Sequence, residues 1–444
     1  MIITNAKIIT KDKIIENGAL FVKDGIISKI GFSSEIVDII EDDSVIDAHG
    51  QFLFPGNICA HTHFYGAFSR GMSIPGDAPD AFHNILKKLW WNLDKSLDAD
   101  AIYFSAMTCL ISAIRYGTTT LFDHHASPNY ISHSLDILEK AVVLSGLRAC
   151  LCYEVTDRDG EYKSKEGIAE NLRFLESCQT RSSDYVKAMF GLHASLTLDD
   201  KTLEEARKVT SEDVGFHIHA AEHSVDQFDC LSKHGMRVID RLNHFGLLND
   251  RTIVAHAVHI DAGEMEILRN NGCWVSHQPR SNMNNAVGLP QIESMHRFGI
   301  KVCLGNDGFS NAMWEEWKAA YLGHKLIRSD PRVMPADLIS TIAVQNNAAL
   351  ANRIFDHQNI GTIEENAAAD LIFVDYKPIT TVTLNNLPWH IIFGLNESMI
   401  TTTICSGKIL MKDRELTEID EESIMNEAYK VSKVVWSKYQ SIAG

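Results

Sequence analysis

The sequence predicts an α/β fold: a (β/α)8 TIM-like barrel with a small β-sandwich domain formed by the N- and C-terminal segments. Three observations predict this fold. Short runs of β-branched residues fill the first 55 positions, and similar runs return beyond position 368. Between these ends, apolar strand-like runs alternate with helical patterns, which is typical of a parallel sheet covered by helices.

The N-terminal segment, residues 1–55, contains three predicted strands. They cover residues 1–10, 18–23 and 26–32, and Asp24-Gly25 between the last two is a strong hairpin signal. We therefore expect an antiparallel start to the chain.

The C-terminal segment, residues 356–444, repeats this pattern with predicted strands at 369–375 and 399–411. Each end is too short to bury a good core alone, so we expect the two ends to form one β domain. Two independent β pieces are the alternative. The amphipathic stretch 420–443 predicts a final helix that packs on the rest of the protein.

The middle of the chain, residues 56–355, predicts the barrel. About eight strand–helix units fit into about 300 residues, as in a (β/α)8 barrel. A doubly wound sheet is the structural alternative, but no glycine-rich phosphate motif follows the first strand. The strand-like runs after the first strand lie at 118–122, 148–152, 185–192, 215–219, 252–255, 274–276 and 301–304.

Composition excludes several classes of partner. The chain has 444 residues and a formal net charge of −17, which argues against nucleic-acid binding and attraction to anionic membranes. The first ten residues lack the pattern of a signal peptide, and no apolar run is long enough to span a membrane. Nine scattered cysteines are typical of reduced thiols. We therefore expect a soluble, cytoplasmic protein.

Several of the 20 histidines stand where predicted barrel strands end. His61 and His63 are two positions apart, so on an extended chain both imidazoles point the same way. Two further strands end in His219 and His256, and Asp307 follows the last strand. Because the carboxyl ends of barrel strands converge on one face, we expect these side chains to meet.

Three imidazoles and a carboxylate, with room left for water, are typical of a catalytic zinc or iron site. The bound ion would acidify a water and generate hydroxide for attack, and Glu222, three residues after His219, would carry protons. Taken singly, each feature has an ordinary interpretation, such as a core histidine for His256 or a turn residue for Asp307. Their joint occurrence at strand ends favours the metal site.

The motifs extend over nearly the whole chain, and together they resemble the amidohydrolase superfamily. The resemblance is to the branch of cytosine and guanine deaminases and triazine chlorohydrolases, and within it to SsnA-type aminohydrolases. The matching stretches include PGNICAHTH at 55–63, YGTTTLFD at 116–123, HIHAAE at 217–222, VAHAVHI at 254–260 and LGNDG at 304–308.

The resemblance implies one divalent metal ion, zinc first and iron second, because Leu192-His193 stands where two-metal relatives carry a carboxylated lysine. It also implies a proton-shuttle role for Glu222 and a water-holding role for His256. Asp307 would double as a ligand and as the base that deprotonates the water, and His193 would contact substrate. The implied metal ligands are His61, His63, His219 and Asp307.

Three further groups of residues are left with two interpretations. His124 and His125 follow a strand near the expected pocket rim. One interpretation is that they contact substrate, and the other is that they belong to a surface loop. His217 shares a face with His219, and core packing is favoured over ligation. The tryptophans at 90, 91 and 314 are core or lid residues.

The resemblance favours a hydrolase that deaminates a small heterocyclic, purine-like substrate. Ring opening of a cyclic amide and dechlorination of a triazine are alternatives, since both use the same attack. A catalytically silent scaffold is disfavoured because all ligands and Glu222 are present. Relatives imply a homodimer.

Overall fold

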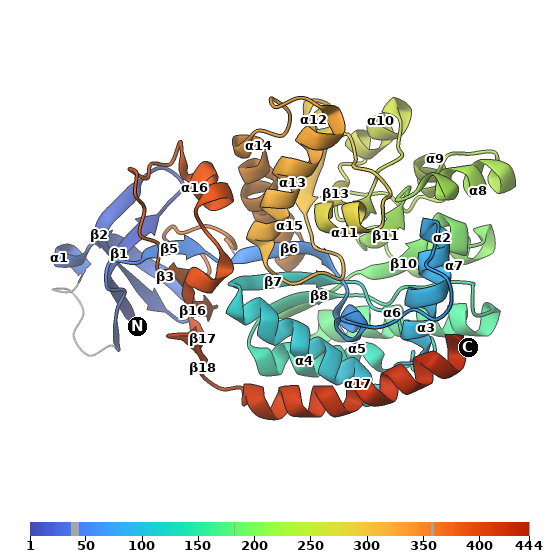
Figure 1. The fold of residues 1–444 in the computed structure, drawn as a ribbon, viewed down its shortest axis with the longest axis horizontal. Helices are drawn as coiled ribbons and strands as arrows, with labels where there is room; N and C mark the ends of the chain where they lie inside the picture. The colour runs from blue at the N-terminus through green and yellow to red at the C-terminus, as the bar shows by residue number, and fades with distance from the viewer. Residues whose placement is uncertain (37–43, 182, 357–358, 444) are drawn as a thin grey trace.

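The computed structural model describes residues 1–36, 44–181, 183–356 and 359–443. The expectation of an α/β fold with parallel sheets is confirmed. In Figure 1, a sheet made from the two ends of the chain lies on the left, and the larger α/β part lies on the right.

Strands from both ends of the chain join in one mixed sheet, which has nine strands within the described residues. The two ends meet where β5 pairs with β15 in antiparallel register, Pro55 opposite Leu371. Asp24-Gly25 forms the expected turn between β2 and β3, with Asp24 in the left-handed region at φ 51°. The strands are β1 (Ile2–Ile9), β2 (Ile14–Lys23), β3 (Ile26–Phe32), β4 (Val45–Asp47), β5 (Phe52–Pro55), β15 (Leu371–Val374), β16 (Ile400–Cys405), β17 (Lys408–Lys412) and β18 (Glu415–Leu416).

The α/β part has two parallel sheets among the described residues. The first contains β6 (Asn57–Thr62), β7 (Thr118–Asp123), β8 (Arg148–Leu151) and β9 (Val186–Ala188). The second contains β10 (Phe190–Ala194), β11 (Phe216–Ala220), β12 (Ile253–His256), β13 (Trp274–His277) and β14 (Lys301–Leu304).

The expected single strand at 185–192 is divided into β9 and β10, and Asn171 explains the division. Its amide accepts hydrogen bonds from the N–H groups of Tyr153 and Gly191 and donates to the Tyr153 carbonyl. This buried amide therefore replaces ladder bonds where the first sheet ends and the second begins. Gly191 is required there, because a Cβ would lie 2.2 Å from the Tyr153 carbonyl oxygen.

A second asparagine occupies the opposite seam, between β14 and β6. The side chain of Asn347 donates to the carbonyls of Ile58 and Leu304 and accepts from the Leu304 N–H. An isolated parallel bridge between Thr62 and Asp307 adds to this seam. The last strand is thereby linked to the first.

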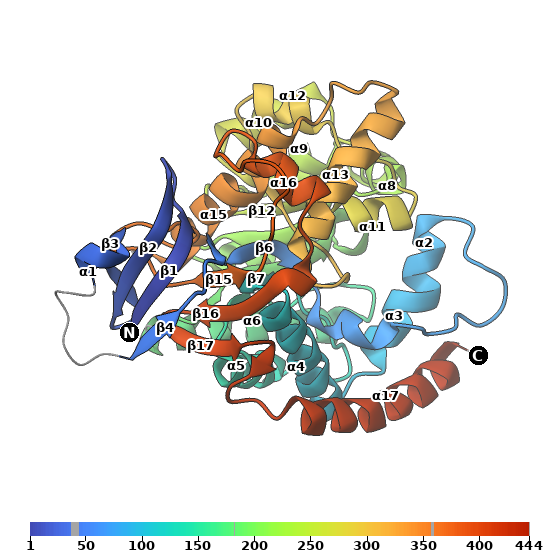
Figure 2. The same ribbon diagram turned by 60° about the vertical axis from the view of Figure 1, so that its left-hand side comes forward.

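Helices surround these sheets, and Figures 1 and 2 show α4 to α6 on one side and α10 to α15 on the other. Their bounds are α1 (Ser33–Ile36), α2 (Phe82–Ile85), α3 (Trp91–Lys95), α4 (Ala99–Arg115), α5 (Ser134–Ser145), α6 (Glu161–Arg181), α7 (Asp200–Val209), α8 (Ser224–His234), α9 (Val238–His244), α10 (Ala262–Asn270), α11 (Pro279–Asn284), α12 (Ile292–Arg297), α13 (Met313–Arg328), α14 (Ala336–Ser340), α15 (Asn347–Phe355), α16 (Leu387–Phe393) and α17 (Glu421–Ala443). Short non-α turns are η2 (Phe64–Ser69), η3 (Leu86–Trp90), η4 (Ser195–Thr197), η5 (Thr341–Asn346) and η6 (Glu397–Met399).

The C-terminal helix α17 runs along α4, as its amphipathic pattern predicted. Two of its side chains reach the chain between β6 and α4. Tyr439 donates a hydrogen bond to the Lys88 carbonyl at 2.7 Å, and the Trp436 indole donates to the Phe68 carbonyl at 2.8 Å. The helix is thus attached to the segment that leads from β6 into α4.

A buried ion pair connects the terminal sheet to the α/β part. Arg148 at the start of β8 pairs with Asp370, just before β15, and both side chains are fully buried. Asp370 also accepts a hydrogen bond from the Ser406 N–H at 2.7 Å.

Among the described residues, no single helix has both the length and the apolar composition needed to cross a membrane. The bent pair Phe82–Lys95 and Ala99–Arg115 meets those two criteria only when its halves are taken together.

Candidate active site

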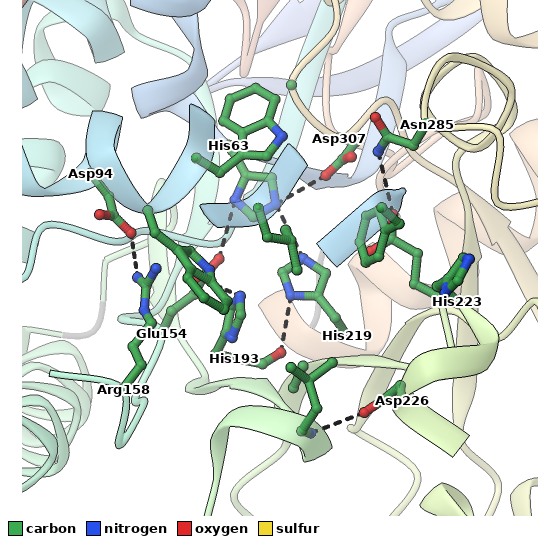
Figure 3. A pocket seen from close by; sticks show the side chains of 18 of the residues that line it. His63, Asp94, Glu154, Arg158, His193, His219, His223, Asp226, Asn285 and Asp307 are labelled. Atoms are coloured by element: carbon green, nitrogen blue, oxygen red, sulfur yellow. Dashed lines mark hydrogen bonds and ion pairs between the residues drawn. The ribbon is translucent and has the colours of Figure 1, made fainter. Parts of the chain in front are cut away.

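Five predicted site residues meet at the carboxyl ends of the parallel strands, and Figure 3 labels three of them, His63, His219 and Asp307. His61 lies within β6 and His63 follows it, while His219 and His256 lie at the ends of β11 and β12. Asp307 comes three residues after β14. The four imidazoles are buried, and the Asp307 side chain is 17% exposed. The convergence expected from strand order is therefore present.

The side-chain atoms of this cluster lie close enough to share one ion. His61 Nε2 lies 3.2 Å from Asp307 Oδ1, and His63 Nε2 lies 3.0 Å from the same oxygen. His63 Nε2 is also 3.2 Å from His219 Nε2. Three imidazole nitrogens and one carboxylate oxygen thus surround one position, which is a donor set that zinc and iron accept.

The Nδ1 atom of each of these imidazoles is held by the protein, which leaves Nε2 for an ion. His61 Nδ1 lies 2.8 Å from His217 Nε2, and the Nδ1 atoms of His63 and His219 contact the carbonyls of His124 and His193. Partners of this kind orient metal-binding histidines and set their tautomers. The residues present therefore fit a divalent cation.

The charges of the cluster also favour a cation beside Asp307. Burial raises the pKa of Asp307, but hydrogen bonds from His61 and His63 outweigh it and bring that pKa well below its usual range. Burial lowers the pKa of His61 to about 4. His63 is buried too, yet its hydrogen bond to Asp307 and the charge of that carboxylate raise its pKa to about 9. The carboxylate thus stays ionised and attracts positive charge.

Backbone strain helps to aim two of these side chains. His256 and Asp307 both lie in the left-handed region, at φ 72° and φ 59°. Such conformations cost free energy in non-glycine residues and are concentrated at functional sites. Gly305 permits the close approach of this turn to β6, because a Cβ there would lie 2.8 Å from the backbone of His61.

Glu222 stands beside the cluster, just after β11. Its Oε2 lies 3.5 Å from His256 Nε2, and the Asn285 amide lies 3.4 Å from its Oε1. Burial and the nearby charge of Asp307 raise the pKa of Glu222 well above its usual range. A raised pKa makes a carboxyl group a better proton donor than an ordinary glutamate.

A pocket opens directly onto these groups. Asp307, His219, His63 and Glu222 are among the residues that line it. Aromatic side chains contributed by η2, α2, η3 and α3 form much of the wall; they are Tyr65, Phe82, Trp90 and Trp91. The pocket therefore combines flat apolar surfaces with the polar cluster.

His193 lies in the pocket wall, where substrate contact was predicted. Its Nδ1 is 2.6 Å from the Thr197 hydroxyl. Trp90 and Trp91 also line the pocket, whereas Trp314 is a core residue that packs on Phe54.

His124 and His125 lie deeper than expected, and neither is among the residues that line the pocket. Both are completely buried. The chain continues in an extended form beyond β7, because His125 forms a bridge with Tyr153. This pairing draws both histidines beneath the rim; His125 then contacts the Ser127 hydroxyl, and His124 stacks on His217.

Three residues of the pocket wall were not predicted from the sequence. Glu154 is buried and its Oε1 lies 3.4 Å from His63 Nδ1. Burial raises the pKa of Glu154 to about 7. Arg158 pairs with Asp94, and its guanidinium lies over the Trp91 ring. The signal for Glu154 was its position shortly after a parallel strand, the same signal that identified His219 and Glu222.

Residues 52–410 match the family described as Amidohydrolase family. The chain belongs to this family, and it is therefore a hydrolase that acts on carbon–nitrogen bonds.

Curated relatives match over nearly their whole length. A 5'-deoxyadenosine deaminase of Methanobrevibacter smithii is 32% identical, with 96% of this chain and 98% of the relative covered. A 5-methylthioadenosine/S-adenosylhomocysteine deaminase of Dictyoglomus thermophilum is 30% identical, with 97% of each chain covered.

Solved structures share the fold at lower identity. An adenosine deaminase from Xanthomonas campestris with bound zinc superposes with a TM-score of 0.87 at 21% identity, covering 98% of both chains. A triazine hydrolase from an Arthrobacter aurescens source has a TM-score of 0.81 at 19% identity, covering 97% of this chain and 99% of that one.

Proposed function

We propose that this enzyme is a metal-dependent deaminase of an adenine nucleoside or a closely related aminopurine. The observation that carries the proposal is the position of Glu222, a buried proton donor between the histidine–aspartate cluster and the aromatic pocket. Deaminase relatives at 30–32% identity support this substrate class.

We assign the metal to His61, His63, His219 and Asp307, with zinc as the first choice. The contacts among these four side chains and the zinc in the adenosine deaminase structure support this assignment. When bound, a divalent cation supplies Lewis acidity that lowers the pKa of a water toward neutrality. One ion satisfies the four donors that converge here.

The protein's own groups divide the proton transfers. Asp307, held ionised by its imidazole neighbours, accepts a proton from the water. Glu222 donates a proton to the purine ring nitrogen beside the carbon that bears the amino group. The Asn282 amide donates to His256 Nδ1 at 3.0 Å, so His256 presents an Nε2–H and can hold the attacking oxygen. Asp307 then passes its proton to the amino group, which leaves as ammonia, and Glu222 regains a proton from the hydroxyl that remains on the ring carbon.

The pocket wall supports a flat ring with a polar substituent. Trp90, Trp91 and Phe82 offer planes for a purine to pack against, and His193 lies within reach of the ring edge. Asp94 and Arg158 add a charged pair at the wall, suited to hydroxyl groups of a sugar. His124 and His125 have no substrate contact in this proposal.

The test is a mass-spectrometric screen of the zinc-loaded protein with 5'-deoxyadenosine, 5-methylthioadenosine, S-adenosylhomocysteine, a hydantoin and a chlorotriazine. Deamination adds about one mass unit and releases ammonia in equal amount. A gain of one water without ammonia would replace the proposal with ring opening, and chloride release would replace it with dechlorination.

We extend the proposal to the domains. Residues 56–355 would form a closed (β/α)8 barrel, supported by the links that Asn171 and Asn347 make at its two seams. Residues 1–55 and 356–444 would form a β-sandwich domain with the terminal helix, supported by a separate apolar cluster that includes Ile3, Leu53 and Leu371.

We also propose a cytoplasmic homodimer. Nine free cysteines within the described ranges support a reducing compartment. Exposed Leu322 and Leu326 on α13 and Phe393 on α16 support burial against a second copy. Light scattering of the purified protein tests the dimer, and cell fractionation tests the location.

A further inference from the structure

His124 is a buried polar side chain without a hydrogen bond. It has no exposed surface, and among the described residues neither of its ring nitrogens completes a hydrogen bond. Buried imidazoles normally satisfy at least one nitrogen, because an unpaired polar group in the interior costs free energy. Glu154 lies beside Nδ1, so Nε2 is the nitrogen left without a partner among the described residues.

The surroundings of His124 point toward the metal cluster. Its ring centroid lies 4.7 Å from that of His219, 5.6 Å from that of His63 and 5.7 Å from that of His61. One ligand atom from each of these four histidines lies within 4.8 Å of the others. With metal–nitrogen bonds of about 2.1 Å, opposite ligand atoms are about 4.2 Å apart. Adjacent ligand atoms on such an ion are about 3.0 Å apart, so the four side chains would move inward by about 1–2 Å in total to share it.

His124 also has the support that a metal-binding histidine needs. Its Nδ1 lies 3.2 Å from Glu154 Oε1, an oxygen that completes no hydrogen bond of its own among the described residues. A carboxylate beside one imidazole nitrogen orients the other toward a metal. The arrangement matches that of His61, His63 and His219, whose Nδ1 atoms are each held by a neighbour.

We propose that His124 is an additional ligand of the metal, with Glu154 as its positioning residue. This inference rests on the metal site of the proposed function: His124 would share the ion with His61, His63 and His219, the three imidazoles grouped with it around one possible ion position. Four imidazoles and a water would give the ion five ligands. Iron, manganese and cobalt accept a centre with this many ligands more readily than a four-coordinate centre.

The test uses cobalt(II) as the probe, in the unmodified protein, in His124→Phe and in the matched control His125→Phe. Phenylalanine keeps the ring that stacks on His217 but removes both nitrogens. The control removes a neighbouring buried imidazole that lies outside the cluster. Visible absorption reports the coordination number, and proton NMR of the cobalt protein counts shifted imidazole N–H signals.

We expect weak absorption, typical of five or six ligands, in the unmodified protein and in His125→Phe. His124→Phe should absorb more strongly, lose one shifted N–H signal and bind cobalt at least about tenfold more weakly. Glu154→Gln is the second variant should His124→Phe not fold, and it should shift the same N–H signal. Loss of affinity alone, with unchanged spectra, would make His124 only a supporting residue.

Two further outcomes separate this inference from the proposed function. An intense four-coordinate spectrum in the unmodified protein would overturn the inference and leave the proposed metal site intact. Failure of the unmodified protein to bind cobalt or zinc at all would overturn the proposed function.

Discussion

At the scale of single residues, the site shifts the pKa values of two carboxyl groups in opposite directions. Hydrogen bonds from two imidazoles bring the pKa of Asp307 well below its usual range, while burial beside that negative charge raises the pKa of Glu222. Two groups of the same chemical type therefore serve as base and acid within one pocket.

The Glu222→Gln variant should lower turnover by about 10²–10⁴-fold, because the amide keeps the shape of the side chain but has no acidic proton. Metal content should be unchanged, since Glu222 lies outside the four proposed ligands. Steady-state kinetics and metal analysis of the same preparation measure both effects. Near-normal turnover would contradict the proton-donor assignment.

The His61→Ala variant should lose metal, because it removes one of three imidazoles around a single position. We expect substoichiometric metal after dialysis and activity that falls in proportion. His259→Ala is the control, since that histidine lies apart from both groups that could hold an ion and contacts the Val287 carbonyl. Full metal occupancy in His61→Ala would refute its assignment.

At the scale of elements, Asp226 in the first turn of α8 secures the loop between β11 and α8, which carries Glu222. Its two carboxylate oxygens accept hydrogen bonds from the N–H groups of Leu196 and Ala221, at 2.9 Å and 2.8 Å. Burial nevertheless raises the pKa of Asp226 to about 7. The loop that carries the proposed proton donor is therefore held by a carboxyl group with its own pH dependence.

This raised pKa predicts a direction for stability against pH. The folded protein holds the Asp226 proton more tightly than the unfolded chain, so stability from this group is present below about pH 4 and is lost as pH rises toward 7. Asp226→Asn removes the effect, which amounts to up to about 4 kcal/mol. Denaturant unfolding at pH 5 and pH 8 should show the wild-type advantage shrinking at the higher pH; a constant difference would disprove the assignment.

The sequence predicted those elements and site residues whose position follows from a short apolar run that forms a parallel strand. His61, His219 and Asp307 could be placed because each follows such a run. The depth of His124 could not, since it depends on the bridge between His125 and Tyr153, two loops apart. The division of the strand at 185–192 likewise depends on a side chain, Asn171, that lies in a helix with no local signal for it.

At the scale of the whole molecule, the Arg148–Asp370 pair connects the two parts of the protein. Asp370→Asn would leave the Arg148 charge buried without its carboxylate, at a cost of about 3–5 kcal/mol. Thermal unfolding should move to lower temperature, with metal content unchanged in the folded protein. The pair of Arg332 and Asp330 at the surface is the control, because its removal should leave the unfolding temperature nearly unchanged.

The attachment of α17 to residues 64–91 has a practical consequence for handling the protein. Tyr439 and Trp436 hold the stretch of chain that supplies Tyr65, Phe82, Trp90 and Trp91 to the pocket. Figure 1 places the C-terminus at the far side of the molecule from the N-terminus. A purification tag at the N-terminus therefore extends from the terminal sheet. A tag at the C-terminus is attached to α17, the helix that holds the pocket wall in place.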